Sequence, residues 1–244
     1  MKLSNTIGFF SEKGYSPELT ESSVRIPRSV NPEELPGFSD GHFFVQDRAS
    51  YISSLVLCAK RGETVVDTCA CPGGKSFAAA ISMENEGRIC SLDLHESKLS
   101  LIRSGADRLG IRIIEAKQCD ATEGREALFA TADAVICDAP CSGLGGLGKK
   151  PDLRYKSSEE ISELPKLQLE ILKRSALYPK VGGRLVYSTC TLNPMENEEV
   201  VKSFLAENPD ICNEIEEKIR KSPLMNSTAP IVKRDETILP APEQ

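Results

Sequence analysis

The sequence predicts an α/β fold, with a mostly parallel sheet and helices on both of its faces. The chain has 244 residues, of which 40% are hydrophobic, and this is enough to bury one substantial core. Its central part alternates short β-branched runs with longer amphipathic stretches, which is the pattern of strands joined by helices in a parallel sheet. Several of the short runs end in Asp or Cys, at the edge of such a sheet where ligands bind.

Five short runs are the predicted strands, because β-branched residues favour the pleated, half-buried surface of a sheet. In chain order they read ETVVDTC (63–69), GRICSLD (87–93), RIIEAK (112–117), DAVICDA (133–139) and GRLVYSTC (183–190). The amphipathic stretches around them predict helices, at residues 46–60, 74–84, 95–109, 158–178 and 195–207.

The two ends of the chain differ from this central part. Residues 1–40 are rich in Pro, Ser and Glu and are expected to be the end of another module plus a connector. The main domain is expected to cover residues 41–244. From about Asn208 the chain is charged, and its last residues, TILPAPEQ, offer at most one weak edge strand.

Composition narrows the class of protein. No apolar run approaches the roughly 20 residues that span a bilayer, and the N-terminus lacks a secretory signal, so a cytoplasmic protein is expected. The nine cysteines are an odd number and lie partly in strand-like runs, which indicates free thiols. A net charge of −6 argues against coating nucleic acid through charge alone. Lys149, Lys150, Arg154 and Lys156 form one local basic cluster, although such runs are more often solvated faces.

The loop after the first predicted strand, DTCACPGGK (67–75), has the features of a ligand-binding turn. Gly73 and Gly74 permit a tight turn and a close backbone approach to a ligand. The loop lacks both the GxxxxGK[ST] pattern and GxGxxG, which lowers the rank of ATP hydrolysis and hydride transfer. Carboxylates follow four strands, and an acid after the second strand can accept ribose hydroxyls. These carboxylates are Asp67, Asp93, Asp120 and Asp138.

Two cysteines lie where the last two strands end, in DAPCSG (138–143) and STCT (188–191). A single cysteine in such a place is more often a small hydrophobic residue than a nucleophile. Cys141 and Cys190 are predicted to lie at neighbouring strand ends beside a carboxylate, and this favours thiol chemistry.

The motifs together resemble the RsmB/Nop2/Sun family of RNA 5-methylcytosine methyltransferases. The resemblance covers about residues 41–207 in order and spacing, and GKKPDLRYK (148–156) is most similar to the bacterial RsmB branch, which modifies small-subunit ribosomal RNA. It rests on GHFFVQDRAS, DTCACPGGK, SLD, QCDAT, DAPCSGLG and YSTCTLNPMENEEVV.

The resemblance implies a Rossmann-like, S-adenosylmethionine-dependent methyltransferase that acts on cytosine in RNA. Cys190 is then the nucleophile that attacks carbon 6 of the base, and Cys141 assists proton removal from carbon 5 and release of the product. Asp138 holds or shares a proton at nitrogen 3, and Lys75 orients Asp138 or the pyrimidine. The target base must be unpaired or extruded.

The family pattern also implies a cofactor site. The loop residues surround the methionine and ribose, Asp93 takes the ribose hydroxyls, Asp120 reads the adenine side, and Asp138 borders both cofactor and base. The loop residues are Cys69, Ala70, Cys71, Pro72, Gly73, Gly74 and Lys75.

The chain departs from the family pattern in three places. Cys71 stands where the family usually has Ala, but Cys69 and Cys71 lack the second ligand pair of a zinc site, so no metal is expected. Residues 1–40 are expected to be only a remnant of the family's N-terminal RNA-binding region. The family's final antiparallel strand is expected to be missing. The sequence does not indicate an oligomeric state.

Two alternatives remain open. A DNA cytosine methyltransferase uses a Pro-Cys nucleophile, which Pro140 and Cys141 would supply. The presence of a second cysteine, in STCT, instead favours an enzyme that acts on RNA, either ribosomal RNA or transfer RNA. The chain can also be a catalytically silent module that only binds cofactor or RNA. If the ends that are expected to be missing are essential for catalysis, such a module would bind the cofactor but transfer no methyl group.

Overall fold

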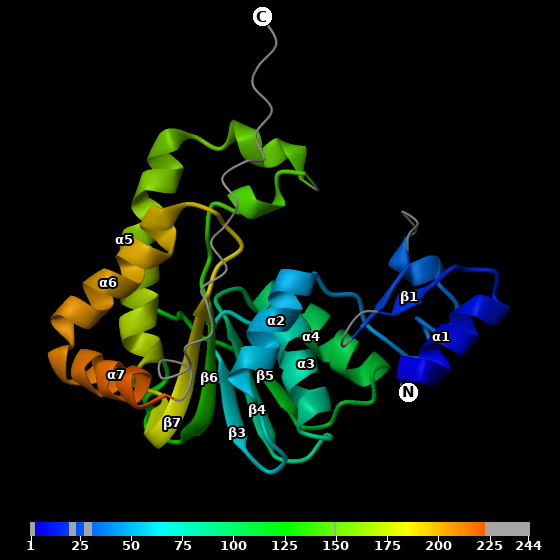
Figure 1. Cartoon of the computed structure of the whole chain (residues 1–244), viewed down its shortest axis with the longest axis horizontal. Coiled ribbons are helices and arrows are strands. Elements are labelled where there is room, and N and C mark those ends of the chain that lie inside the picture. Colours follow the sequence, from blue (N-terminus) through cyan, green and yellow to red (C-terminus); the bar gives the residue numbers. More distant parts are fainter. Residues whose placement is uncertain (1–2, 20–22, 27–30, 149, 223–244) are drawn as a thin grey trace, which may run out of the picture. The chain divides into compact units, whose positions relative to one another are not determined.

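A five-stranded sheet forms the centre of the protein, with the strands in the order β5-β4-β3-β6-β7 (Figure 1). The computed structural model describes residues 3–19, 23–26, 31–148 and 150–222. All four pairings in this sheet are parallel, so the predicted parallel α/β sheet is confirmed. The strands are β3 (Thr64–Asp67), β4 (Arg88–Asp93), β5 (Ile114–Gln118), β6 (Ala132–Asp138) and β7 (Pro179–Ser188).

Both faces of the sheet are buried. Successive residues of a strand point to opposite faces, and neighbouring residues of β3 pack in two different cores. Val65 packs in one core with Leu57 of α2 and Ile102 of α4, whereas the neighbouring Val66 packs in a second core with Tyr178. Ile171 of α5 covers the end of β6. The four helices that flank the sheet are α2 (Arg48–Leu57), α3 (Gly74–Ser82), α4 (Glu96–Arg108) and α5 (Ser158–Ser175).

Local capping signals set where two of these helices begin. The Asp47 carboxylate accepts a 3.0 Å hydrogen bond from the Ala49 amide at the start of α2. Ser157 and Glu160 form a reciprocal capping box at the start of α5. The later helix α6 (Glu198–Glu207) lies within the predicted range 195–207, and all five predicted helices are present.

The N-terminal region has more structure than the sequence analysis expected. It contains helix α1 (Leu3–Glu12) and a short antiparallel pair, β1 (Glu18–Leu19) and β2 (Val24–Arg25). The guanidinium of Arg108 in α4 donates to the carbonyl oxygens of Phe38 and Phe43, at 2.6 Å and 3.0 Å, and lies over the Phe38 ring. These contacts join the end of this region to the sheet domain. A remnant RNA-binding role for residues 1–40 stays a prediction.

The chain divides into two compact units, residues 1–201 and 202–244. The second unit contains helix α7 (Pro209–Lys221), which the sequence analysis did not predict because it treated this stretch only as charged. Three pairs of opposite charge four residues apart stabilise α7, and Pro209 occupies its first turn. Two predictions concern residues outside the described ranges. They are the weak strand in TILPAPEQ and the absence of a final antiparallel strand.

In the described part of the chain, no helix is long and apolar enough to cross a membrane.

Candidate active site

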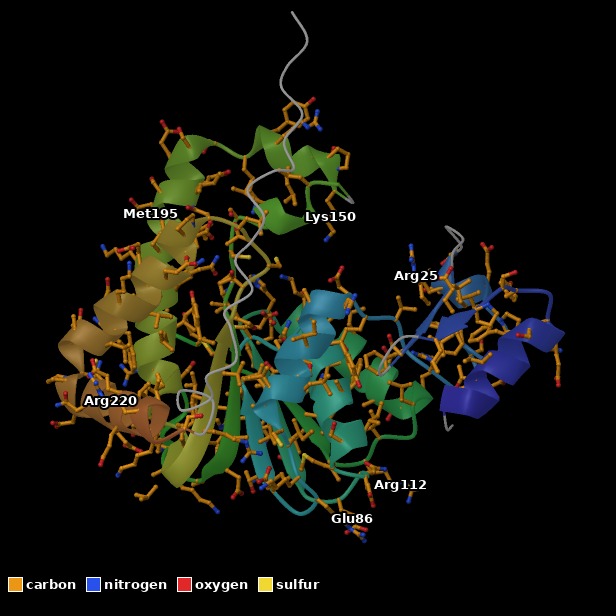
Figure 2. The ribbon with its side chains drawn as sticks, viewed as in Figure 1. Arg25, Glu86, Arg112, Lys150, Met195 and Arg220 are labelled. Carbon is orange, nitrogen blue, oxygen red and sulfur yellow. The ribbon has the colours of Figure 1, made fainter. Side chains whose placement is uncertain are left out.

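The carboxyl ends of the parallel strands bring most of the predicted site residues to one edge of the sheet. Figure 2 shows Lys150 and Met195 on loops at this edge, and Glu86 and Arg112 at the opposite edge. Asp93 is the last residue of β4 and Asp138 the last of β6. Three local arrangements result: a glycine-containing loop, a lysine–aspartate pair and a pair of thiols.

The loop between β3 and α3 is held against the end of β4. The Ala70 amide donates to the Leu92 carbonyl at 2.8 Å, and the Cys71 amide donates to Asp93 Oδ2 at 3.1 Å. Gly73 has φ of 109°, and a Cβ there would lie 2.6 Å from the Phe77 ring. Both its conformation and its neighbour therefore require glycine.

Asp93 and Asp120 are held in place by backbone amides. Asp93 accepts from Cys71 and also from the His95 amide, at 3.2 Å. Asp120 Oδ1 accepts from the amide and the hydroxyl of Thr122, at 2.8 Å and 2.6 Å, and these bonds lower the pKa of Asp120. Each carboxylate oxygen has two lone pairs, so both residues retain capacity to accept hydroxyl or amine donors of a ligand.

Burial shifts the pKa values of three residues in the loop region. Asp67 is 1% exposed and accepts a 2.7 Å hydrogen bond from Ser76, and burial raises its pKa to about 7. Burial also raises the pKa of the Cys69 thiol, and that of the partly exposed Cys71. Asp67 is thus a strand-end carboxylate that belongs to the core, and both thiols stay neutral.

Lys75 and Asp138 form an ion pair that links α3 to the end of β6. Lys75 Nζ lies 2.5 Å from Asp138 Oδ2, with the two side chains 12% and 31% exposed. Lys75 also donates to Ser50 Oγ at 3.0 Å, and Ser188 Oγ donates to Asp138 Oδ1 at 2.7 Å. The Lys75 ammonium and the Ser188 hydroxyl therefore hold both oxygens of Asp138 in a fixed orientation.

Cys141 and Cys190 lie in direct contact, as the strand-end prediction required. Their sulfur atoms are 3.1 Å apart, and the Cys190 amide donates to Cys141 Sγ at 3.3 Å. The hydrogen bond from the Cys141 thiol lowers the pKa of Cys190 to about 6 against the opposing effect of burial. The same bond raises the pKa of Cys141, with burial adding to it. The directions of the two shifts favour the thiolate on Cys190 and the proton on Cys141.

The sequence analysis missed several polar residues that hold this site together. Ser50 and Ser188 contact the Lys75–Asp138 pair, and Glu196 is fully buried beneath the cysteine loops. Ser188 and Glu196 both lie inside the quoted segment YSTCTLNPMENEEVV. Glu196 stands between Met195 and Asn197 and just before two further glutamates, so no local pattern distinguishes it, and its burial depends on packing that the sequence does not show.

The predicted basic cluster lies on the loop before α5. Lys156 Nζ lies 3.4 Å from the Cys141 carbonyl oxygen, so one member reaches the cysteine loop. Lys150 and Arg154 are exposed, and Lys149 lies outside the described residues. Within the described ranges, no three His, Cys, Asp or Glu side chains gather in a way that could hold a metal ion.

Residues 54–242 match the sequence profile of the family described as 16S rRNA methyltransferase RsmB/F. A probable ribosomal RNA small subunit methyltransferase B of Bacillus subtilis is 45% identical over 83% of this chain and 45% of its own length. Ribosomal RNA small subunit methyltransferase B of Klebsiella pneumoniae is 34% identical over 77% of this chain and 44% of its own length. This chain therefore spans less than half of these curated relatives.

Solved structures from Pyrococcus horikoshii show the same similarity. A methyltransferase homologue superimposes with a TM-score of 0.74 at 28% identity, over 84% of this chain and 66% of that one. The structure of NSun6 with SFG, an analogue of S-adenosylmethionine, gives a TM-score of 0.65 at 29% identity, over 76% of this chain and 49% of that one.

Proposed function

Because the chain belongs to the RsmB/F family of 16S rRNA methyltransferases, we propose that it methylates carbon 5 of cytosine in small-subunit ribosomal RNA, with S-adenosylmethionine as the methyl donor. The contact between Cys141 and Cys190 carries this proposal. Covalent activation of a pyrimidine needs a nucleophile and nearby groups that bind protons and charge. A thiolate next to a second thiol, beside a lysine–aspartate pair, provides both.

The loop and the strand-end carboxylates fit the cofactor. The backbone at residues 69–74 turns tightly against Asp93. The remaining lone pairs of this carboxylate can accept hydrogen bonds from the two ribose hydroxyls. Asp120 lies after the adjacent strand β5 and retains an oxygen for the adenine side. When bound, S-adenosylmethionine supplies an electrophilic methyl group on a sulfonium centre.

Cys190 activates the base in this mechanism. Its thiolate forms a bond to carbon 6 of cytosine, and the electrons of the 5,6 double bond move onto the ring, which makes carbon 5 nucleophilic. The lowered pKa of Cys190 means that no separate base has to remove its proton first.

Asp138 and Lys75 stabilise the charge that develops on the pyrimidine ring. A proton shared between the Asp138 carboxyl group and nitrogen 3 moves onto nitrogen 3 while the thiolate attacks, and it returns to Asp138 when the 5,6 double bond forms again. The Lys75 ammonium at 2.5 Å stabilises negative charge on Asp138 and on the adjoining pyrimidine. Ser188 keeps the other oxygen of Asp138 engaged, so the carboxylate does not rotate.

Cys141 acts in the second half of the reaction. The thiolate of Cys190 is what raises the pKa of Cys141 most. Once the Cys190 sulfur is bound to carbon 6 it carries no negative charge, and Cys141 can ionise more readily. Cys141 then takes the proton from carbon 5, the 5,6 double bond forms again, and the bond from carbon 6 to the Cys190 sulfur breaks.

The experiment is transfer of a labelled methyl group to unmodified small-subunit ribosomal RNA, followed by nucleoside analysis. Label in 5-methylcytosine with the wild-type chain, and none with Cys190→Ala, is the expected result. Label in any other nucleoside would contradict the proposal, as would binding of S-adenosylmethionine without transfer to RNA. The second outcome is that of a silent module.

A further inference from the structure

Glu196 is a buried carboxylate that the mechanism above does not use. It lies in the short turn Pro194–Glu196 between β7 and α6 and is 0% exposed. The described groups that act on its charge belong to Ser142, Gln168 and Asn193, none of which is a cation. An ionised carboxylate without a cation is costly to bury unless several donors satisfy its oxygens.

Four hydrogen bonds from three separate segments meet this carboxylate. Oε2 accepts from the Ser142 amide at 2.8 Å and from the Gln168 side chain at 2.9 Å. Oε1 accepts from the Ser142 hydroxyl at 2.5 Å and from the Asn193 side chain at 3.1 Å. Burial raises the pKa of Glu196, but these bonds outweigh it and keep the pKa below its ordinary value. Glu196 therefore stays ionised in the interior.

The donors adjoin the two reactive cysteines. Ser142 directly follows Cys141 in the loop after β6. The Ser142 hydroxyl also lies 2.7 Å from that of Thr191, which directly follows Cys190 in the loop after β7. Asn193 anchors the far end of that second loop. One buried carboxylate thus holds the backbone on both sides of the thiol pair.

We propose that Glu196 is a positioning residue, which clamps the Cys141 loop to the Cys190 loop and so sets the distance between the two sulfur atoms. The inference rests on the proposed function, because it names what keeps that reaction's thiols in contact. The groups that face Cys190 are Cys141, Asp138 and Lys75, and Glu196 acts on the thiolate only through the first of them.

The test measures the reactivity of Cys190 without any methyl transfer. Iodoacetamide alkylation is followed across pH by mass spectrometry of the tryptic peptide 185–202, in which Cys190 is the only cysteine. In Glu196→Gln the amide NH2 group faces hydrogen-bond donors of Ser142, Gln168 and Asn193, so these bonds are lost and the two loops separate. The pH midpoint of alkylation then rises by about one unit, which is a tenfold loss of thiolate below the midpoint. The matched control is Glu198→Gln, an exposed glutamate two residues away, which keeps the wild-type midpoint.

Ser142→Ala keeps the test decisive if Glu196→Gln does not fold. It removes only one hydroxyl donor and retains the Ser142 amide bond, so a smaller rise of the midpoint is expected. A wild-type midpoint in folded Glu196→Gln, or in Ser142→Ala where Glu196→Gln is unfolded, would overturn the proposal. Failure of methyl transfer in the wild-type chain would instead count against the proposed function, and alkylation would still report on the clamp.

Discussion

The two edges of the sheet each contain an ion pair between neighbouring elements, but the two pairs differ in what surrounds them. At the amino edge, Arg184 lies 2.6 Å from Glu63 and also donates to the carbonyl oxygens of Leu57 and Cys58. At the carboxyl edge, the further side-chain hydrogen bonds of Lys75 and Asp138 within the described residues are to hydroxyl groups.

This difference supports a structural role for the Arg184 pair and the proposed chemical role of the Lys75 pair. The Arg184 guanidinium is bound to backbone carbonyls at the C-terminal end of α2, whereas the Lys75 pair can exchange its hydroxyl partners for a ligand. The carboxyl edge also contains the two thiols in contact. The exchangeable partners and the contact between the two thiols, rather than burial and short distances, are therefore the features that support the proposed site at the carboxyl edge.

The largest expected effect follows from removing the nucleophile. Cys190→Ser should lower the rate of methyl transfer by at least about 10⁴-fold, because a hydroxyl is not ionised at neutral pH. The matched control is Cys58→Ser at the amino edge, another exposed cysteine, which should keep the wild-type rate. Equal losses in both variants, measured with labelled donor under single turnover, would remove the distinction between the edges.

Lys75→Met tests the chemical pair. The rate should fall about 100-fold, since the charge on Asp138 and the ring loses its counter-ion. The free energy of unfolding should change by only about 1 kcal/mol, because Asp138 is 31% exposed and retains Ser188. A variant that loses stability and keeps its rate would show that Lys75 is structural.

Arg184→Met tests the structural pair and should give the opposite result. The free energy of unfolding should fall by about 2 to 3 kcal/mol, less than for a fully buried pair because Arg184 is 31% exposed. Denaturant titration measures this loss, and the folded fraction should transfer methyl groups at the wild-type rate. An unchanged unfolding midpoint would contradict the structural assignment.

The pH dependence of Cys190 sharpens the comparison within the carboxyl edge. With its pKa lowered to about 6, the thiolate is nearly complete at pH 7 and falls about tenfold by pH 5. Iodoacetamide alkylation of Cys190 should follow this curve and level off above about pH 7. In Cys141→Ala the donor is lost, so the midpoint should rise; an unchanged midpoint would show that the neighbouring thiol does not cause the low pKa.

The smallest effect is expected at the cofactor carboxylates. Asp120→Ala should weaken binding of S-adenosylmethionine by about five- to tenfold, because one partly exposed hydrogen bond contributes about 1 kcal/mol net. Exposed Glu123, in the same turn, provides the control as Glu123→Ala. Calorimetric titration measures both, and equal affinities would exclude Asp120 from the cofactor site.

The strands and the site cysteines were predictable because local pattern and topology determine them. Val65 and Val66 mark a buried strand by their β-branched side chains, and parallel order then places the ends of β6 and β7 side by side. Helix α7 was missed because the stretch from about Asn208 was treated only as charged, and the four-residue spacing of its opposite charges was not used.

The parts of the site that were not predictable depend on contacts between distant segments. The burial of Glu196 requires Ser142, Gln168 and Asn193 to converge on it, and no local pattern shows this. Asp67 is similar, because its strand-end position gave no sign that Ser76 would enclose it in the core.

The most direct test of the Cys190 thiolate is trapping with RNA that contains a mechanism-based cytosine analogue, whose adduct cannot be released. Wild-type protein and Cys141→Ala should both form a covalent complex, and Cys190→Ala should form none. A complex that persists in Cys190→Ala and disappears in Cys141→Ala would contradict the account, and would assign the nucleophile to the Pro140–Cys141 segment.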